Sequence, residues 1–303
     1  MTYDVAIVGG SFAGQAAALQ LGRARRRVLL LDARRPRNRF ARFSHGFLGQ
    51  DGRPPSAIIA EAANQLKPYG TVEPREGSAE GADSTATGFR LSLSESDEVQ
   101  ARRLILATGV RDLLPSIPGL EERWGVTVLH CPYCHGYELD QKPIGVLGES
   151  ELAIHQAMLV PDWGPTTLFT QGVLTPAPDE EAALAARGVT IEDTPIVELI
   201  GKSPALEAVR LADGRSVGLS GLFTAPRTEQ ASGLAAALGC AFEDGPTGPL
   251  IAIGERQSTS VPGVFAAGDA ASPMANATLA AAAGVMAATA AHHSLIYETA
   301  GTQ

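Results

Sequence analysis

Cysteine is scarce in this chain: its 303 residues include three, at positions 131, 134 and 240. So small a number excludes the disulfide-rich scaffolds that hold many small secreted proteins together. The N-terminus MTYDVAIVGG runs directly into an apolar strand and has no basic leader or cleavage site, so we expect a cytoplasmic protein. In a reducing cytosol, two cysteines separated by two residues are typical of redox catalysis or metal binding, whereas Cys240 is expected to be a buried apolar residue.

The sequence lacks the features of nucleic-acid-binding and membrane-spanning proteins. The formal net charge is −9, which argues against a general affinity for nucleic acid. Arginines do crowd residues 23–42, where a cationic helix end with a solvated loop and a nearby anionic ligand are both open interpretations. The apolar stretch of residues 275–291 is mostly alanine and contains Asn276, Thr278 and Thr289, which predicts a packed helix rather than a membrane span.

Residues 3–33 have the pattern of a dinucleotide-binding unit, with the sequence YDVAIVGGSFAGQAAALQLGRARRRVLLLDA. It predicts an apolar strand, a glycine turn, a helix and a second strand that ends in an acid. The amides of such a helix start suit a pyrophosphate, and the acid suits a ribose hydroxyl. Ser11 stands where the usual motif has its second glycine. Its side chain leaves less room for the phosphates to approach the backbone. The residues predicted to bind the dinucleotide here are Gly9, Gly10, Ser11, Phe12, Ala13, Gly14 and Asp32.

Two later segments, LILATG at residues 104–109 and VPGVFAAGDAA at residues 261–271, each read as an apolar strand with a glycine at its end. In this order they resemble the segments with which two-dinucleotide flavoproteins complete an FAD domain, which implies FAD as the cofactor. The resemblance places the aspartate of the second segment near the ribityl and phosphate groups, and the following helix start near the flavin ring. A solvated loop is an equally open interpretation of Asn38 and His45. The further residues expected at the cofactor are Arg37, Asn38, His45, Ala107, Thr108, Gly109, Gly268, Asp269, Asn276, Ala277 and Thr278.

The parts of this FAD pattern lie at the two ends of the chain. Between them, prolines at residues 115 and 118 mark a hinge, and a second strand–turn–helix pattern begins in KPIGVLGESELAIHQAMLV at residues 142–160. Gly245 and Pro246 mark a return hinge. We therefore predict an α/β fold with two nucleotide-binding, Rossmann-like domains, the second inserted into the first. Residues 1–113 and 245–303 would form the FAD-binding domain, and residues 114–244 an inserted NAD(P)-binding-like domain that carries the cysteine pair.

The segment HCPYCHGYE, at residues 130–138, places Cys131 and Cys134 between His130 and His135. With the split FAD domain, it resembles the low-molecular-weight thioredoxin reductases over essentially the whole chain. In that family the second cysteine faces the flavin and the first faces the substrate, which assigns these roles to Cys134 and Cys131. The resemblance also implies a homodimer.

Two departures from the reductases change the expected reaction. His135 stands where the reductases have an aspartate, and CPYCHGYE is similar instead to dithiol oxidases of the gliotoxin and holomycin type. Those enzymes close a disulfide in a small molecule and pass electrons from FAD to oxygen. The inner glycine turn carries Glu149 and Glu151 where a pyrophosphate would rest, and no arginine or lysine occurs between residues 142 and 187. We therefore expect no use of NADPH.

These observations predict an FAD-dependent oxidoreductase that oxidises a small-molecule or protein dithiol, with oxygen as the acceptor. Cys131 and Cys134 would be the redox pair and His135 the general base, with His130 as its competitor. No metal is expected, because a structural zinc site needs four ligands and the chain has no second pair at ligand spacing. A structural disulfide across so short a loop would stabilise little. Two alternatives stay open: a thioredoxin reductase-like enzyme supplied by NADPH, ferredoxin or another donor, and a flavin-binding redox sensor without turnover.

Overall fold

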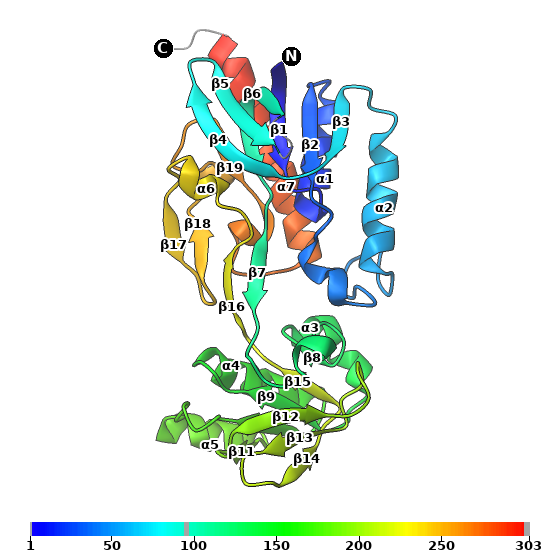
Figure 1. Cartoon of the computed structure of the whole chain (residues 1–303), viewed down its shortest axis with the longest axis vertical. Coiled ribbons are helices and arrows are strands. Elements are labelled where there is room, and N and C mark those ends of the chain that lie inside the picture. Colours follow the sequence, from blue (N-terminus) through cyan, green and yellow to red (C-terminus); the bar gives the residue numbers. More distant parts are fainter. Residues whose placement is uncertain (1, 94–96, 300–303) are drawn as a thin grey trace. The chain divides into compact units, whose positions relative to one another are not determined.

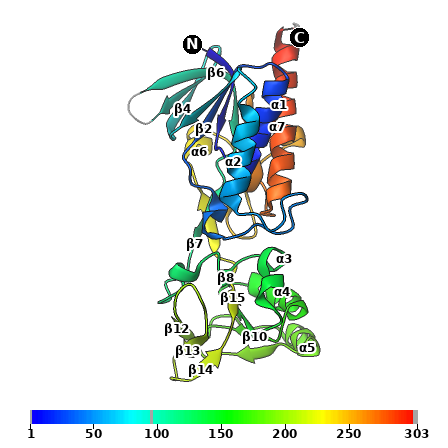
Figure 2. The same ribbon diagram turned by 90° about the vertical axis from the view of Figure 1, so that its right-hand side faces the viewer.

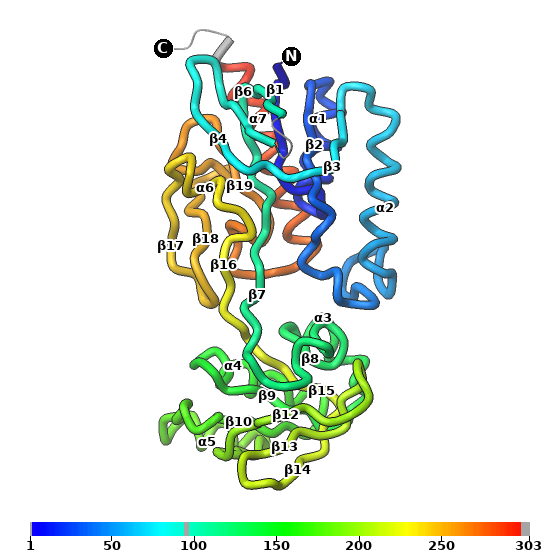
Figure 3. Tube along the Cα trace, in the orientation of Figure 1, coloured from blue at the N-terminus to red at the C-terminus, as the bar shows by residue number. Residues whose placement is uncertain are grey.

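The computed structural model describes residues 2–93 and 97–299, and the chain forms two compact units (Figure 1). The first unit consists of Met1–Arg39, Ser56–Arg111 and Thr228–Gln303, and the second of Phe40–Pro55 and Asp112–Arg227. In the trace of Figure 3, blue, cyan and orange-red segments from both ends of the sequence build the first unit, and the green middle of the chain builds most of the second. The fold class predicted from the sequence is confirmed: the chain is a mixed α/β protein, and each unit contains a parallel sheet with helices.

The boundaries of the units differ from the predicted ones at two places. Residues 228–244 lie in the first unit, where Leu234, Ala235 and Cys240 are buried in its core. Residues 40–55 lie in the second unit, where His45 approaches Glu138. Glycine and proline mark where a chain can bend, but the unit to which a segment belongs is decided by packing with residues far away in the sequence.

The first unit is built on a seven-stranded sheet with the strand order β3-β2-β1-β6-β5-β4, to which β19 adds by pairing with β6. β1, β2, β3, β6 and β19 run parallel, whereas β4 and β5 form an antiparallel hairpin that joins the sheet through β6. β1 and β2 are nearly continuous apolar runs because parallel strands are buried on both faces. The strands are β1 (Thr2–Val8), β2 (Val28–Asp32), β3 (Val72–Glu76), β4 (Ala79–Thr85), β5 (Gly88–Leu93), β6 (Glu98–Leu106) and β19 (Val264–Ala266).

Helices α1 (Phe12–Arg23) and α7 (Ala277–Thr299) pack side by side on this sheet (Figure 2). By length and composition, Ala277–Tyr297 could cross a membrane. In this fold the helix packs small residues, among them Ala287, Ala288 and Ala291, against the sheet and α1. The other elements of the first unit are α6 (Leu234–Ala237), β17 (Phe242–Asp244), β18 (Pro249–Ile251), η6 (Glu255–Gln257) and η7 (Gly268–Ala270). Four elements cross the boundary between the units: η1 (Arg37–Phe40), α2 (Pro55–Leu66), β7 (Val110–Leu113) and β16 (Arg227–Gln230).

The second unit has a parallel five-stranded sheet with the order β11-β10-β9-β15-β8 and an antiparallel sheet of β12, β13 and β14. The chain leaves β9 toward β10 and later returns on its other side as β15, so the carboxyl ends of these strands form a switch point, the usual ligand position in such sheets. The elements of this unit are η3 (Glu121–Arg123), β8 (Val128–Leu129), α3 (Pro132–His135), η4 (Tyr137–Leu139), β9 (Ile144–Leu147), α4 (Leu152–Leu159), η5 (Val160–Asp162), β10 (Thr166–Phe169), α5 (Pro178–Ala186), β11 (Thr190–Glu192), β12 (Ile196–Ile200), β13 (Ala208–Leu211), β14 (Ser216–Gly218) and β15 (Gly221–Phe223).

Candidate active site

In the first unit, the carboxyl ends of β1, β6 and β19 bring together the predicted dinucleotide residues. The strands are neighbours in one sheet, so the glycine turn after β1 lies beside Ala107–Gly109 after β6 and Gly268–Asp269 after β19. Ser11 is the first residue before α1, and its side chain makes no cap hydrogen bond to the helix. The first turn of α1 carries uncharged side chains. This arrangement fits an anionic phosphate group, which helix-start amides attract.

Close packing at the glycine turn explains why glycines stand there. A Cβ atom on Gly14 would lie 1.7 Å from the carbonyl oxygen of Gly9, and one on Gly10 would lie 2.3 Å from Cβ of Asp32. Asp32 is held at the end of β2, where its Oδ1 accepts a hydrogen bond from the backbone N–H of Arg34 at 2.8 Å. The turn and the acid are thus fixed relative to each other, as binding of a pyrophosphate and a ribose requires.

We expect Gly10→Ala to weaken FAD binding by about 5- to 150-fold, the equivalent of an overpacking cost of about 1 to 3 kcal/mol. The added methyl group would meet Cβ and Oδ2 of Asp32 at 2.3 and 2.7 Å, so the turn or the acid must move. The measurement is the dissociation constant of FAD for the refilled apoprotein. Gly70→Ala is the matched control, because a Cβ there meets no atom within 4 Å. Equal FAD affinities of the two variants would contradict this account of the turn.

Two further predicted residues of the first unit pair with each other. Nη1 of Arg37 lies 3.0 Å from Oδ2 of Asp269, and both side chains are about four-fifths buried. One residue of the arginine-rich segment is therefore tied to the turn after β19. Asn276 has a structural task in addition to its predicted one, since its Oδ1 accepts hydrogen bonds from the N–H groups of Thr278 and Leu279 at 2.8 and 3.2 Å and so caps α7. The contacts of Arg37, Asp269 and Asn276 with a cofactor stay predictions.

In the second unit, the two cysteines of the C-x-x-C motif form a disulfide, with their Cα atoms 5.3 Å apart. Cys131 is the N-cap of α3, Pro132 begins the helix, and Cys134 lies within it. Trp163 supports this segment, because its ring packs edge-on against Tyr133 with centroids 5.4 Å apart and lies close to Gly136. Cys240, in contrast, is buried in the first unit as predicted; burial raises the pKa of its thiol, which also bonds to Thr259.

His135 follows the second cysteine and lies in a partly buried environment. Burial lowers the pKa of its imidazole below the ordinary value of 6.5, with Glu138 acting in the opposite direction and His45 in the same direction. A lowered pKa keeps the ring neutral near pH 7, and the neutral ring is the form that accepts a proton from a thiol. The position and protonation of His135 therefore suit the role of general base.

Two residues of the second unit have contacts that the sequence did not predict. Gln156, a buried residue of α4, donates a hydrogen bond from Nε2 to the backbone carbonyl of His130 at 2.8 Å and so fixes the residue before Cys131. The position of Gln156 in the sequence, 22 residues after Cys134, does not indicate this contact. His45 was expected at the cofactor, and the structure places it in the second unit, between Asp51 and Glu138.

At the switch point of the second unit, carboxylates stand where a pyrophosphate would bind. Glu149 and Glu151 occupy the turn between β9 and α4 and are exposed. Although Glu149 reaches solvent, partial desolvation by the neighbouring protein raises the pKa of its carboxyl. After β10 and β11, buried Thr170 donates a hydrogen bond to Oδ1 of Asp193 at 2.9 Å, which adds another acid to this edge of the sheet.

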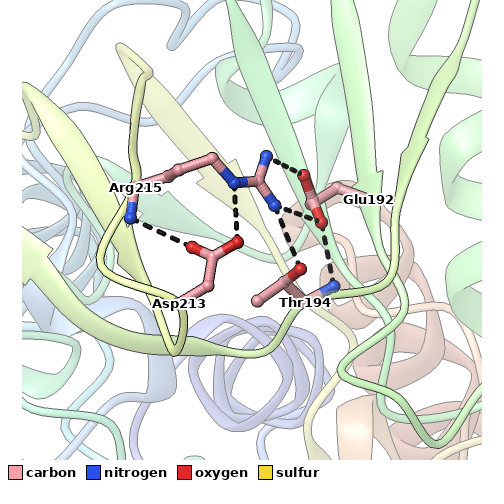
Figure 4. Close-up of polar contacts among 4 residues, drawn as sticks. All are labelled: Glu192, Thr194, Asp213 and Arg215. Carbon is pink, nitrogen blue, oxygen red and sulfur yellow. Dashed lines mark hydrogen bonds and ion pairs between the residues drawn. The ribbon is translucent and has the colours of Figure 1, made fainter.

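The arginine that reaches this edge is already bound by acids (Figure 4). Arg215, in the turn between β13 and β14, donates hydrogen bonds to both carboxylate oxygens of Glu192 at 2.7 and 3.1 Å and to Asp213 at 2.6 Å. It also reaches the hydroxyl of Thr194. The Arg215 hydrogen bonds lower the pKa of Glu192 to about 2, with help from Thr194. The positive charge of the guanidinium is thus balanced by two carboxylates of the protein itself.

Comparisons with known proteins agree over nearly the whole chain. The sequence profile of the family described as pyridine nucleotide-disulphide oxidoreductase matches residues 3–293. Thioredoxin reductase tcpT of Claviceps purpurea is 33% identical over 279 residues, which are 88% of this chain and 86% of the relative. An oxidoreductase from Agrobacterium tumefaciens has a structure that superposes with a TM-score of 0.94 at 51% identity, covering 98% of this chain and 99% of that one. The structure of HlmI superposes with a TM-score of 0.93 at 38% identity and covers 99% and 95%.

Proposed function

Since the chain belongs to the pyridine nucleotide-disulphide oxidoreductase family, we propose that it is an FAD-dependent dithiol oxidase that passes electrons to oxygen. The observation that carries the proposal is the disulfide of Cys131 and Cys134, directly followed by His135. Members of the family are flavoproteins that generally bind FAD. The glycine turn packed against Asp32, with the uncharged start of α1, supports the same cofactor here.

Dithiol oxidation follows from thiol–disulfide exchange at this pair. A substrate thiolate attacks Sγ of Cys131, which forms a mixed disulfide and releases Cys134 as a thiolate. The second substrate thiolate attacks the substrate sulfur of that bond, closes the product disulfide and releases Cys131. Two electrons have then moved from the substrate to the enzyme pair. Bound FAD would supply the acceptor that takes these two electrons and delivers them to oxygen, which becomes hydrogen peroxide.

His135 would provide the thiolates by accepting protons from the substrate thiols. A thiolate, and not a thiol, is the nucleophile in exchange, so a base beside the disulfide raises the rate. Because burial holds the pKa of His135 below 6.5, the ring is neutral at pH 7 and becomes charged only in more acidic solution. The oxidation rate should therefore fall as the pH is lowered through that pKa.

Steady-state oxidation of dithiothreitol in air by the holoenzyme, with oxygen uptake and peroxide formation, tests this proposal. A flavin-binding sensor would be reduced once and would not turn over. Replacing His135 by alanine should slow the oxidation by a factor of about 10² to 10⁴, the usual contribution of general acid–base catalysis. His155→Ala is the control, since this histidine is exposed on α4 of the same unit. If the His135 variant oxidises the dithiol at the unchanged rate, His135 is not the general base, and His130 or water must accept the proton.

The acidic switch point of the second unit supports an oxidase over a reductase that draws on NADPH. Glu149 and Glu151 repel a pyrophosphate, and Arg215 is neutralised by Glu192 and Asp213. In the reductases that the chain resembles, cations in this region hold the 2′-phosphate of the nucleotide. We therefore propose that electrons enter from the dithiol and leave to oxygen.

A further inference from the structure

The loop of residues 40–55 in the second unit is held together by hydrogen bonds of its own. Its two ends are joined by backbone hydrogen bonds from Ser44 to Arg53 at 2.8 Å and from Gly52 to Ser44 at 2.9 Å. Inside it, Oδ1 of Asp51 accepts a hydrogen bond from the N–H of Gly46 at 2.8 Å. The carboxylate of Asp51 is thus held by a partner within the loop and not by residues 130–138, which carry the two cysteines and are called the redox segment below.

His45 joins this loop to the redox segment. Its Nδ1 lies 3.7 Å from Oδ1 of Asp51, and its Nε2 lies 3.5 Å from Oε1 of Glu138, three residues after His135. The His45 side chain is 21% exposed, whereas those of Asp51 and Glu138 are 69% and 43% exposed, so the imidazole is largely buried and its acidic partners reach solvent. A single imidazole with an acid at each nitrogen has a defined orientation, because each nitrogen faces its own partner.

We propose that His45 is a positioning residue of the redox site: oriented by Asp51, it holds the carboxylate of Glu138 beside the redox segment and thereby controls the protonation of His135. This inference rests on the proposed function, in which His135 is the base. His45 lies 90 positions before His135 in the sequence, so only the fold brings it near the segment that contains this base.

The charges around His135 oppose each other. Among the described residues, the ionisable groups that act on its ring are Glu138 and His45, and Asp51 stands behind His45. The Glu138 carboxylate favours the imidazolium form and raises the pKa of His135, whereas protonated His45 disfavours it and lowers that pKa. His45 also occupies the Glu138 carboxylate, which reduces its effect on His135. Removing either group should therefore move the titration of His135, and the two directions should be opposite.

The test compares His45→Gln with Glu138→Gln in the oxidised holoprotein, by NMR titration of the histidine ring signals. The His135 signal is assigned by its loss in His135→Ala. We expect the His135 midpoint to rise in the His45 variant and to fall in the Glu138 variant, each by about 0.2 to 0.7 pH units, the shift that a partly exposed charge pair produces. Asp51→Asn should give a smaller rise, since it loosens His45 without removing it. In each of the three variants, the acid limb of kcat/KM for dithiol oxidation should shift in the same direction as the His135 midpoint.

Shifts of the same sign in both glutamine variants would overturn the proposal, because a mere loosening of the structure changes both in one direction. An unshifted His135 midpoint in the Asp51 and His45 variants would overturn it as well. The NMR titration needs no turnover, so it is separate from the proposed function. Opposite midpoint shifts without any dithiol oxidation by the unmodified enzyme would support the arrangement around His135 and refute the oxidase.

Discussion

Replacing either Cys131 or Cys134 by serine should lower dithiol oxidation by at least about 10⁴-fold, the order of loss that follows removal of a covalent nucleophile. Either change leaves one sulfur, and a single thiol cannot accept two electrons as a disulfide. Folding and FAD content should be retained, since a serine fits the space of a cysteine. The measurement is steady-state oxygen uptake with dithiothreitol, at matched FAD content of the variants and the unmodified enzyme.

The two variants should differ in what they trap. With Cys134 replaced, Cys131 can still form a mixed disulfide with an aromatic disulfide reagent, and no neighbouring thiolate remains to expel it. A stable adduct on Cys131 is therefore expected, and a slower reaction is expected at Cys134 in the Cys131 variant. Cys240→Ser is the control and should oxidise dithiols at the normal rate, because this thiol is buried in the first unit and bonded to Thr259. A folded but inactive Cys240 variant would reveal a second thiol relay.

Local sequence was sufficient to predict the parts of the site that depend on neighbours in the chain. The turn of Gly9 to Gly14 and the acid at Asp32 belong to one strand–helix–strand unit, and the structure brings them together as their spacing predicts. The same holds for Glu149 and Glu151, which stand at the turn after β9. In these cases the backbone of a short segment determines where the side chains lie, and the periodicity of apolar residues is visible in that segment.

The contacts that depend on tertiary packing could not be read from the sequence. His45 meets Glu138, and Arg215 meets Glu192, only because segments far apart in the chain are folded together. Gln156 reaches the carbonyl of His130 because β8 and β9 lie on either side of β15 in the same sheet. A histidine in a loop or a glutamine on an apolar helix lies in no sequence pattern that identifies its partner. The contacts of His45 with Asp51 and Glu138, and of Gln156 with His130, were therefore not predicted.

Reduction of the flavin by NADPH should be weaker than in a reductase by several orders of magnitude. Charge-assisted hydrogen bonds to phosphates contribute about 1.5 to 3 kcal/mol each, and every 1.4 kcal/mol changes an affinity by about tenfold. The carboxylates of Glu149 and Glu151 would repel the pyrophosphate of the nucleotide. The guanidinium of Arg215 already donates hydrogen bonds to Glu192 and Asp213. Loss of two or three such contacts would raise the dissociation constant of the nucleotide above the millimolar range.

Anaerobic titration of the FAD-loaded enzyme, followed by the visible absorbance of the flavin, tests the direction of electron flow most directly. NADPH and NADH should leave the absorbance unchanged, whereas dithiothreitol should bleach it, and admission of air should restore the colour and yield hydrogen peroxide. A dithiol-reduced flavin that stays bleached in air would indicate a protein electron partner in place of oxygen. Rapid bleaching by micromolar NADPH would contradict the oxidase and identify the chain as a reductase.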